Sequence, residues 1–304
     1  MKRSVVIAIS AFHSDAAVIS LVEEIFANPH PEVGAVIVVD SLGSGLISEI
    51  AVERQWSLRY INANTNLGSA GNLARRMEHA AETCAEWCLC LNHDANWEAD
   101  RLSALLSSAR SRPRVGAVYP LLDHSPREPR WEDGRRHFNP FAATRISKIP
   151  TDKVAAEVLW SSSNSALYSL IPRSENIVIM SELWMGYEDL EYGIALYNAG
   201  WVQLSCRTAR LSQVFDYIPR RLFGRVVYIP DKPTWYSYYN ARNLILIWQK
   251  YGSKGIPLWT ILKKLFQSVI KILLFEKNKA ARLRLLYLGT KAGITGQGGK
   301  GPYP

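Results

Sequence analysis

The sequence is poor in cysteine, and its few cysteines follow no pattern typical of a disulfide-rich or metal-binding protein. Only Cys84, Cys88, Cys90 and Cys206 occur among the 304 residues. Cys88 and Cys90 lie two apart in an apolar segment, where they would share one face of a strand at a separation that disfavours a disulfide. No C-x-x-C pair for zinc or redox chemistry is present. These absences exclude a disulfide-stapled fold and indicate a reducing compartment.

Long hydrophobic runs are also missing. No uninterrupted apolar run reaches the roughly 18 residues of a membrane-spanning helix, so no conventional span is predicted. The apolar run at residues 5–12 meets His13, Ser14 and Asp15 without a cleavage-type site, so we expect a first strand rather than a secretory leader. Hydrophobic residues make up 48% and charged residues 21% of the chain, as in an ordinary globular protein.

Acidic residues are nearly absent from the C-terminal part of the chain. From residue 254 onward there are ten Lys or Arg residues but only one acid, Glu276. The whole chain has 36 basic and 27 acidic residues, which leaves 26 of each for residues 1–253. A nucleic-acid enzyme more often spreads basic charge over its working face. A neutral body with a basic tail favours an anionic membrane surface as a partner and no nucleic acid.

Residues 258–275 have the pattern of a basic amphipathic helix. One stripe of this helix contains Lys263, Lys264, Gln267 and Lys271. The opposite face contains Leu258, Ile261, Leu262, Leu265, Val269 and Ile272. Such a helix can lie in a membrane interface, and packing on the domain body is the alternative. With the charge count, we expect a cytoplasmic protein bound peripherally to the inner face of the cell membrane. The glycine-rich residues 293–301 are expected to be flexible.

Apolar segments alternate with helical patterns through the first 121 residues. Strand-like segments fall at 5–10, 33–40, 57–62, 87–92 and 115–121, and helical patterns lie between them. This alternation predicts an α/β fold with a mainly parallel, Rossmann-like sheet flanked by helices. Further strands are expected at 160–170 and 201–206, and further helices at 188–199 and 236–251.

Polar residues follow the apolar segment at 87–92. Asn92, His93, Asp94, Ala95 and Asn96 come directly after the strand-like residues. In open α/β sheets, ligands bind at the carboxyl edge, to which such a strand would deliver them. Asp94 is therefore the first functional candidate, and a cap on the helix that follows is the alternative.

A glycine-rich turn precedes the helical pattern that ends near residue 83. It contains Asn66, Gly68, Gly71 and Asn72. Glycines before a helix let a ligand approach the backbone, and a helix start favours an anion. The spacing matches neither the Walker loop nor the dinucleotide G-x-G-x-x-G motif. An ordinary tight strand-to-helix turn is the alternative interpretation.

A second acidic stretch lies at residues 184–192. Glu188 and Asp189 fall at the start of a helix that we expect to end at Gly200. The helix dipole would stabilise both carboxylates and keep them ionised, so that one can act as a general base. Acids are also common in first turns for purely structural reasons. The neighbouring Trp184 and Tyr187 favour a site, because aromatic faces stack on sugar rings and bases.

Together these segments resemble family-2 glycosyltransferases of the GT-A fold, the bacterial type that builds cell-surface polysaccharide. The resemblance covers roughly residues 5–251. It rests on V-D-x-x-G-S at 39–44, N-x-G-x-A-G-N at 66–72, L-N-x-D-A at 91–95, G-Y-E-D-x-E at 186–191 and Y-Y-N-A-R-N at 238–243. No single motif is decisive, but their order and spacing are fairly specific.

The resemblance implies a role for each matching residue. The nucleotide-sugar donor would be bound by Asp40, Asn66, Gly68, Asn72, Asp94 and Trp184. Asp94 would also hold Mg²⁺ or Mn²⁺ on the diphosphate. Asp189 would be the catalytic base that takes a proton from the acceptor hydroxyl, with Glu188 beside it. A lipid-linked or glycan acceptor would then receive the sugar with inversion at the anomeric carbon.

We expect a GT-A domain at residues 1–225, with a nucleotide-binding half at 1–121 and an acceptor half at 122–225. Residues 226–304 are expected to form a helical region that associates with the membrane. The leading hypothesis is an inverting glycosyltransferase. A nucleotidyltransferase is one alternative, although residues 10–15 supply no Lys or Arg for a triphosphate. A catalytically decayed binding protein with the same fold is the other.

Overall fold

The computed structural model describes residues 3–124, 134–139, 142–148, 154–213, 217–222, 225–230 and 232–302. The strands are β1 (Val5–Ala11), β2 (Val33–Asp40), β3 (Leu58–Asn62), β4 (Trp87–Leu91), β5 (Val115–His124), β6 (Gly134–Asn139), β7 (Ala142–Lys148), β8 (Ala155–Glu157), β9 (Ala166–Ser169), β10 (Val202–Gln213), β11 (Tyr217–Leu222) and β12 (Arg225–Pro230). The helices are α1 (Asp15–Ala27), α2 (Leu46–Glu53), α3 (Gly68–Ala81), α4 (Ala99–Ala109), α5 (Ile171–Ser174), α6 (Glu188–Asn198), α7 (Tyr236–Tyr251), α8 (Leu258–Phe275) and α9 (Lys279–Ile294).

The central sheet has the order β3-β2-β1-β4-β9-β5-β10-β8. Strands β1 to β4 are parallel to one another, and β10 is parallel to β5. β9 runs antiparallel between β4 and β5, and β8 is antiparallel to β10. The β-branched runs of β1 and β2 are buried on both faces, as a sheet covered by helices requires. The prediction of a mainly parallel α/β sheet is confirmed.

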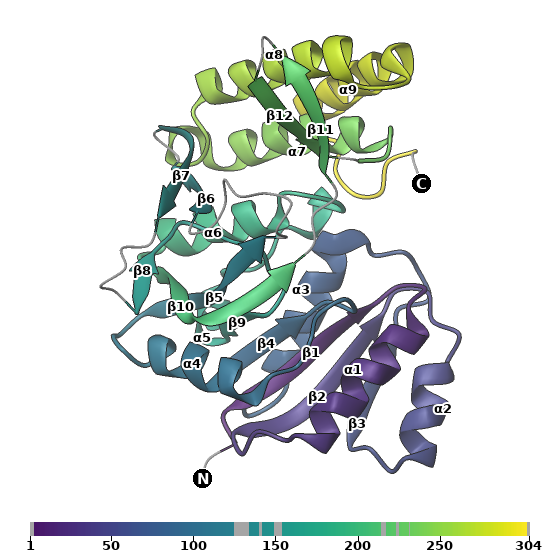
Figure 1. Ribbon diagram of the computed structural model, residues 1–304, viewed down its shortest axis with the longest axis vertical. Helices are drawn as coiled ribbons and strands as arrows, with labels where there is room; N and C mark the ends of the chain where they lie inside the picture. The colour runs from purple at the N-terminus through teal and green to yellow at the C-terminus, as the bar shows by residue number, and fades with distance from the viewer. Residues whose placement is uncertain are drawn as a thin grey trace.

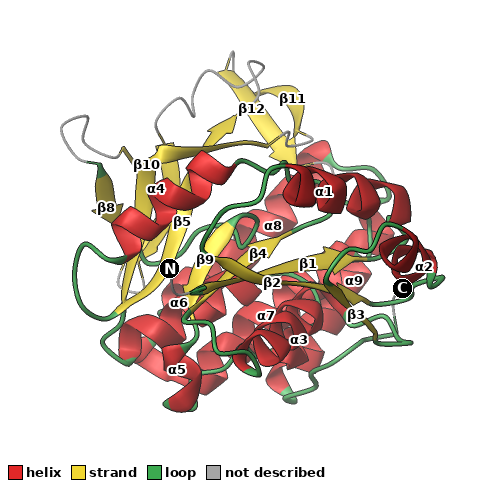
Figure 2. Ribbon diagram, turned by 90° about the horizontal axis from the view of Figure 1, so that it is seen from below, coloured by secondary structure: helices red, strands yellow, loops and turns green. Residues whose placement is uncertain are grey.

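Helices cover both faces of this sheet (Figure 2). α1 and α4 pack on one face, where Val18, Val22 and Leu105 meet alternate residues of β1 such as Ile7. α3 and α6 cover the other face, where Leu73 and Met77 are among the residues in the second core. Apolar residues thus recur every 3.6 residues in the helices and every second residue in the strands, and the two sets meet on both faces of the sheet. Two large cores position the strand ends that form the site.

The carboxyl-terminal helices α7, α8 and α9 lie together at the end of the molecule farthest from α2 (Figure 1). Gly289 and Gly293 of α9 face α7 so closely that a Cβ on either would collide with the carbonyl of Tyr238 or of Arg242. The two glycines thus allow the helix backbones to touch. The division of the chain into domains at residue 225 stays a prediction.

The glycine-rich end differs from the flexible tail that the sequence led us to expect. Gly299 donates its N–H to the carbonyl of Glu182, and its own carbonyl accepts a bond from Arg242 at 2.7 Å. The backbone N–H of Gly301 donates to the hydroxyl of Tyr239 at 3.1 Å. The glycine content predicted a flexible tail, but glycine also permits close approach of the backbone to a neighbouring element. Residues 298–301 dock on the loop before α6 and on α7.

The strand expected at 160–170 is also different. Only β9 is a strand, while residues 160–165 form a turn that buries Ser163, Asn164 and Ser165. Polar side chains in this turn bond to the site described below, whereas an extended strand would point half of them away from it.

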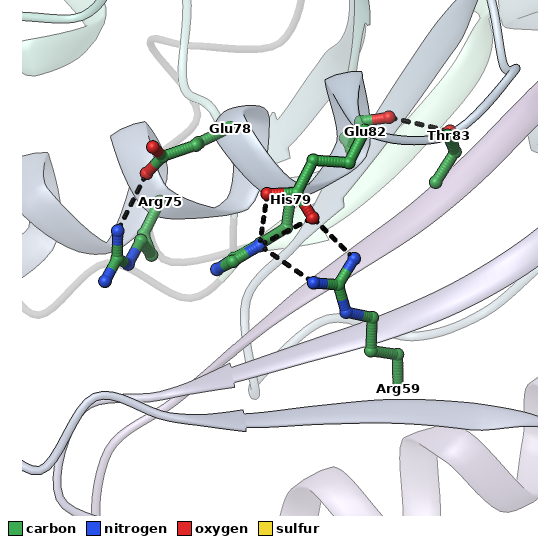
Figure 3. Close-up of polar contacts among 7 residues, drawn as sticks. Arg59, Arg75, Glu78, His79, Glu82 and Thr83 are labelled. Carbon is green, nitrogen blue, oxygen red and sulfur yellow. Dashed lines mark hydrogen bonds and ion pairs between the residues drawn. The ribbon is translucent and has the colours of Figure 1, made fainter.

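Surface ion pairs connect α3 with β3 (Figure 3). Arg59 contacts Glu82 at 2.7 Å, and His79 lies 3.1 Å from the same carboxylate. Hydrogen bonds from His79 and Arg59 lower the pKa of Glu82. Arg75 pairs separately with Glu78 at 3.0 Å. This outer face of α3 is exposed, and its inner face carries the residues that line the site.

Candidate active site

A cavity of about 370 Å³ opens beside the carboxyl ends of β1 and β4. Its walls come from these strand ends, the first two turns of α3, the turn at residues 160–165, and the segment from Trp184 to Glu188. Trp235, just before α7, closes one side. The sequence predicted a ligand site at this edge, and the cavity lies there.

The amide groups of the β4 end are fixed from several directions. Asn92 accepts a hydrogen bond from Ser10 at 3.4 Å on its side chain, and its backbone N–H donates to Asn164 at 3.1 Å. Asn164 also donates to Asp94 at 3.4 Å. Asn92 and His93 line the cavity, whereas Asp94 lies exposed beside them. The turn at residues 160–165 therefore holds the β4 end and Asp94 through one buried amide.

The start of α3 presents backbone to the cavity. Gly68 has φ +65°, and a Cβ there would collide with the carbonyl of Trp184, so glycine is required. The side chain of Asn66 accepts the N–H of Gly68 at 3.0 Å. Asn66 and Gly68 both line the cavity, as the motif predicted. A helix N-terminus that opens into a cavity favours an anionic ligand.

Asn72 and Arg76 lie one turn apart on the inner face of α3. Asn72 donates to the carbonyl of Val39 at 3.0 Å, and its side-chain oxygen is buried without a partner. Arg76 is 3% exposed and donates to the carbonyl of Leu91 at 3.1 Å, while its Nε has no partner. Both residues line the cavity. Among the described residues, no carboxylate lies within ion-pair distance of Arg76. A buried guanidinium without such a partner at a cavity wall favours an anionic ligand there.

Asp40 does not line the cavity. It is fully buried, and its carboxylate accepts the hydroxyl of Tyr60 at 3.0 Å and the N–H of Leu42 at 3.2 Å. Burial raises the pKa of Asp40, although these two bonds oppose the shift. Gly43 lies directly over the carboxylate, leaving no space for a Cβ. Ser41, next in the chain, lines the cavity in its place.

Glu188 and Asp189 begin α6, as predicted. Glu188 is 8% exposed and lines the cavity, and one of its carboxylate oxygens is buried without a partner. Asp189, next in the chain, is half-buried and also has an unpartnered carboxylate oxygen, and it accepts bonds from the hydroxyl and backbone N–H of Ser163. Glu188 thus lies in the cavity wall, and the carboxylate of Asp189 is near enough to feel its charge.

The pKa shifts of this pair run against the expectation that the helix dipole keeps both carboxylates ionised. Burial and the charge of Glu188 raise the pKa of Asp189 to about 8. Burial also raises the pKa of Glu188, while a bond with Ser69 and the positive charge of Arg76 oppose it. Desolvation outweighs the dipole because Glu188 is buried and Asp189 half-buried, unlike carboxylates on an exposed first turn. The pair retains a proton near neutral pH.

The loop before α6 is held by the helix α7. Trp184 and Tyr187 have φ values of +56° and +69°, which are strained for residues with side chains. Asn243 donates its amide to the carbonyls of Leu183, Met185 and Gly186 at 2.9 Å each. The motif at 238–243 therefore positions the acid pair from a distance.

Aromatic residues form one wall of the cavity. Trp184 is 4% exposed, its indole N–H donates to the carbonyl of Asn66 at 3.2 Å, and its ring lies 4.7 Å from that of Tyr239. Trp235 is half-buried with its ring 6.3 Å from Trp184. Both tryptophans line the cavity, so either face can meet a flat ligand such as a base or sugar.

The fit of a divalent cation was tested on the oxygen and nitrogen donors near Asp94. Throughout the described ranges, no group of three or more His, Cys, Asp or Glu side chains could hold a metal ion. Asp94 supplies one exposed carboxylate, and its described neighbours Asn92 and Asn164 are amides. His93 adjoins Asp94 and lines the cavity, and Asp94 is the single carboxylate of this set, so a cation held here would need further oxygen ligands from a bound phosphate.

Sequence reasoning did not single out Arg76 or Trp235, and it placed Ser163 only within a polar stretch at 160–164 that faces a cleft. Arg76 and Ser163 carry no motif, and Trp235 precedes the recognised segment at 238–243. Arg76 had one available signal: it lies four residues after Asn72 and therefore on the same helix face. The contact of Ser163 with Asp189 had none, because only the folded turn brings the two residues together.

This architecture is the GT-A-like glycosyltransferase fold, as solved structures of similar shape indicate. GalNAc-T7, solved with UDP, GalNAc and Mn²⁺, aligns with a TM-score of 0.64 and 10% identity over 96% of this chain and 56% of that one. The mannosyltransferase PcManGT from Pyrobaculum calidifontis, solved with GDP-Man and Mn²⁺, gives 0.56 and 13% over 95% and 86%. TarS 1-349 of S. aureus with UDP gives 0.52 and 12% over 96% and 72%. The chain thus spans little more than half of the GalNAc-T7 chain.

The family follows from the sequence itself. Residues 6–167 match the model described as glycosyl transferase family 2, and this segment is more than half of the chain. The chain belongs to glycosyl transferase family 2. The resemblance in the motifs is confirmed for family and fold. No curated protein matches the chain.

Proposed function

We propose that this protein transfers a sugar from a nucleotide-sugar donor to a hydroxyl of a lipid-linked or glycan acceptor, with inversion. The observation that carries the proposal is the pairing, in one cavity, of the α3 start and Arg76 with Glu188 at the mouth of α6. Cation and helix N–H groups suit a diphosphate, and a carboxylate pair suits proton removal. Structures of similar fold were solved with UDP or GDP-Man, which supports a nucleotide-sugar donor.

In this proposal the donor diphosphate lies against the N-terminus of α3 and the guanidinium of Arg76. Asn66, Gly68 and Asn72 contact the donor, and Trp184 with Trp235 encloses the base or the sugar. Asp40 contributes indirectly, by fixing the loop that carries Ser41. We thus assign to Ser41 the direct contact with the donor that the motif implied for Asp40.

The reaction is a displacement at the anomeric carbon. The acceptor oxygen forms a bond to this carbon while the bond from carbon to the phosphate oxygen breaks. The proton of the acceptor passes to Asp189, and the negative charge that develops on the diphosphate is stabilised by Arg76 and by the α3 N–H groups. Preorganised charges of this kind lower the barrier because they need no reorientation during the reaction.

The first experiment screens UDP-, GDP- and dTDP-sugars by thermal shift and then tests transfer to a lipid-linked acceptor with the donor that binds. We expect one nucleotide class to raise the melting temperature. Asp189→Asn should lower the transfer rate at least a hundredfold while leaving donor binding intact. Transfer at the wild-type rate would contradict the assignment of the base. Binding without transfer or donor hydrolysis would favour the decayed binding protein.

The divalent cation is tested through Asp94. If Asp94 holds Mn²⁺ or Mg²⁺ together with the donor phosphates, Asp94→Asn should weaken donor binding only when the cation is present. Isothermal titration with and without Mn²⁺ measures this difference. Equal affinities for the wild type and the variant in both conditions would remove the metal role of Asp94. Asn96→Ala, two residues along the same loop and exposed, is the matched control.

A further inference from the structure

Helix α8 has two apolar faces, and only one of them packs on the protein. Ile261 and Ile272 are 2% exposed, and Leu265 and Val269 pack beside them against the cores formed with α7 and α9. The sequence had grouped these four with Leu258 and Leu262 as a membrane face. The structure corrects that grouping, because this side of the helix is used for packing.

The second apolar face of α8 points away from the body. It consists of Trp259 (74% exposed), Leu262 (50%), Phe266 (66%), Ile270 (40%) and Leu273 (45%). Steps of three or four residues place these five side chains on one side of the helix, about a quarter turn or more from Ile261 and Ile272. An exposed apolar stripe that runs the length of a helix marks an interaction surface.

Basic side chains border this stripe on the side away from the body. Lys263 and Lys271 lie there with Gln267 between them, and Lys271 pairs with Glu276 at 2.6 Å. Glu276 is the single acid among residues 254–304, against ten Lys and Arg residues. The rest of the chain is balanced in charge. The partner that covers the stripe therefore has to carry negative charge as well as an apolar layer.

We propose that α8 lies in the surface of an anionic lipid bilayer, with Trp259, Phe266 and Leu273 inserted among the acyl chains. A helix with an inserted apolar face and lysines at its border binds in the plane of the interface. Lysine side chains reach the headgroups while their stems cover apolar surface. Among the described residues, no helix is long and apolar enough to cross a bilayer.

A bilayer contact through α8 would fix the position of the cavity relative to the membrane. α8 packs on α7, and α7 holds the loop that begins α6 through Asn243. The bilayer contact is thus separated from the acid pair by one helix. This extension rests on the proposed function, since it places a lipid-linked acceptor near the site, whereas the bilayer contact itself does not depend on catalysis.

The test is flotation of the full chain with vesicles of phosphatidylcholine alone or with 30% phosphatidylglycerol, in about 0.15 M salt. The wild type should float only with the anionic vesicles. Trp259→Ser combined with Phe266→Ser should reduce the bound fraction at least tenfold, and Lys263→Glu should reduce it severalfold. Val52→Ser, which removes an apolar side chain 78% exposed on α2, is the matched control and should float like the wild type.

Three results would overturn the proposal. The wild type could remain unbound with anionic vesicles, or the double variant could float as well as the wild type. The double variant could also convert a dimer to a monomer by light scattering, which would assign the stripe to a second copy of this chain. Thermal melting of each variant confirms folding. No donor or acceptor is present, so failure here is distinct from failure of the glycosyltransferase assay.

Discussion

At the scale of single residues, the decisive feature is a carboxylate pair that holds a proton near neutral pH. Asp189 is destabilised as an anion by burial and by Glu188, and Ser163 and Arg76 offset only part of this. A base of this kind gains proton affinity, which helps it to take the acceptor proton. The same property makes the reaction and the stability of the fold depend on pH.

The rate of transfer should therefore rise with pH. The active form of Asp189 is deprotonated, so kcat/KM should increase about tenfold per unit below the apparent pKa of the pair and level off above it. The pKa of about 8 for Asp189 places the bend near pH 8. Glu188→Gln removes the neighbouring charge and should move the bend to lower pH. A profile that is flat from pH 6 to 8 in both proteins would contradict this assignment.

The stability of the fold should fall with rising pH, whereas the rate of transfer rises. The pKa of Asp189 is about 8 in the folded protein and 3.8 for an unperturbed aspartate, which stands for the unfolded state. Between pH 3.8 and about 8, the folded state therefore binds a proton that the unfolded state releases. The contribution of this group to the free energy of unfolding is thus lost as pH rises from about 4 to 8. Asp189→Asn, which does not titrate, should melt several degrees higher than the wild type at pH 8.5, and the gap should shrink at pH 5. An equal gap at both pH values would argue against the shift.

Arg76 should be needed for donor affinity. Arg76→Met keeps most of the buried volume and removes the charge, so binding of the nucleoside diphosphate should weaken about tenfold or more. Isothermal titration measures the loss. Arg75→Met is the matched control, since Arg75 adjoins it on α3 but points to the surface pair with Glu78 (Figure 3). Similar losses in the two variants would indicate a general effect of charge.

At the scale of elements, the strained loop before α6 depends on α7. Trp184 and Tyr187 adopt left-handed backbone, at a cost of about 1–3 kcal/mol each, and the amide of Asn243 holds the carbonyls between them. The N–H of Gly299 bonds to the carbonyl of Glu182, and the buried Arg242 donates to the carbonyls of both residues. These bonds hold the start of the same loop. The elements after residue 167, outside the family match, thus set the geometry of the acid pair.

Asn243→Ala should uncouple this loop. Three buried carbonyls lose their shared donor, so the free energy of unfolding should fall by about 1–3 kcal/mol. The transfer rate should fall more than donor affinity, because the start of α6 shifts. Gln249→Ala on the same helix, which removes an exposed amide bond to Ile294, should change both quantities little. Equal effects of the two substitutions would remove the special role of Asn243.

At the scale of the whole molecule, one sheet edge gathers segments that are far apart in the sequence. Ser10, Asn72, Asn92, Ser163, Glu188 and Trp235 meet at one cavity. The carboxyl ends of β1 and β4 and the start of α3 converge there because the strand-to-helix loops of parallel strands all lie at the carboxyl edge of the sheet. The start of α6 reaches the same cavity from the antiparallel part of the chain after β9. The basic excess lies at the other end of the chain, on the helices that cover α7 (Figure 1).

The sequence by itself determined the alternation of strands and helices, the family, and the position of Asn66, Gly68 and Glu188 at element ends. These features are local: apolar period, glycine and capping chemistry can be read within a few residues. The bounds of β2, α7 and α8 agree with prediction for this reason.

Only the tertiary structure decided the properties that arise from packing. It buried Asp40 beneath Gly43, brought Ser163 and Arg76 to the acid pair, and raised the pKa of Asp189. It also chose which of the two apolar faces of α8 the body covers. Desolvation and contact depend on residues distant in the chain, so no local pattern contains them.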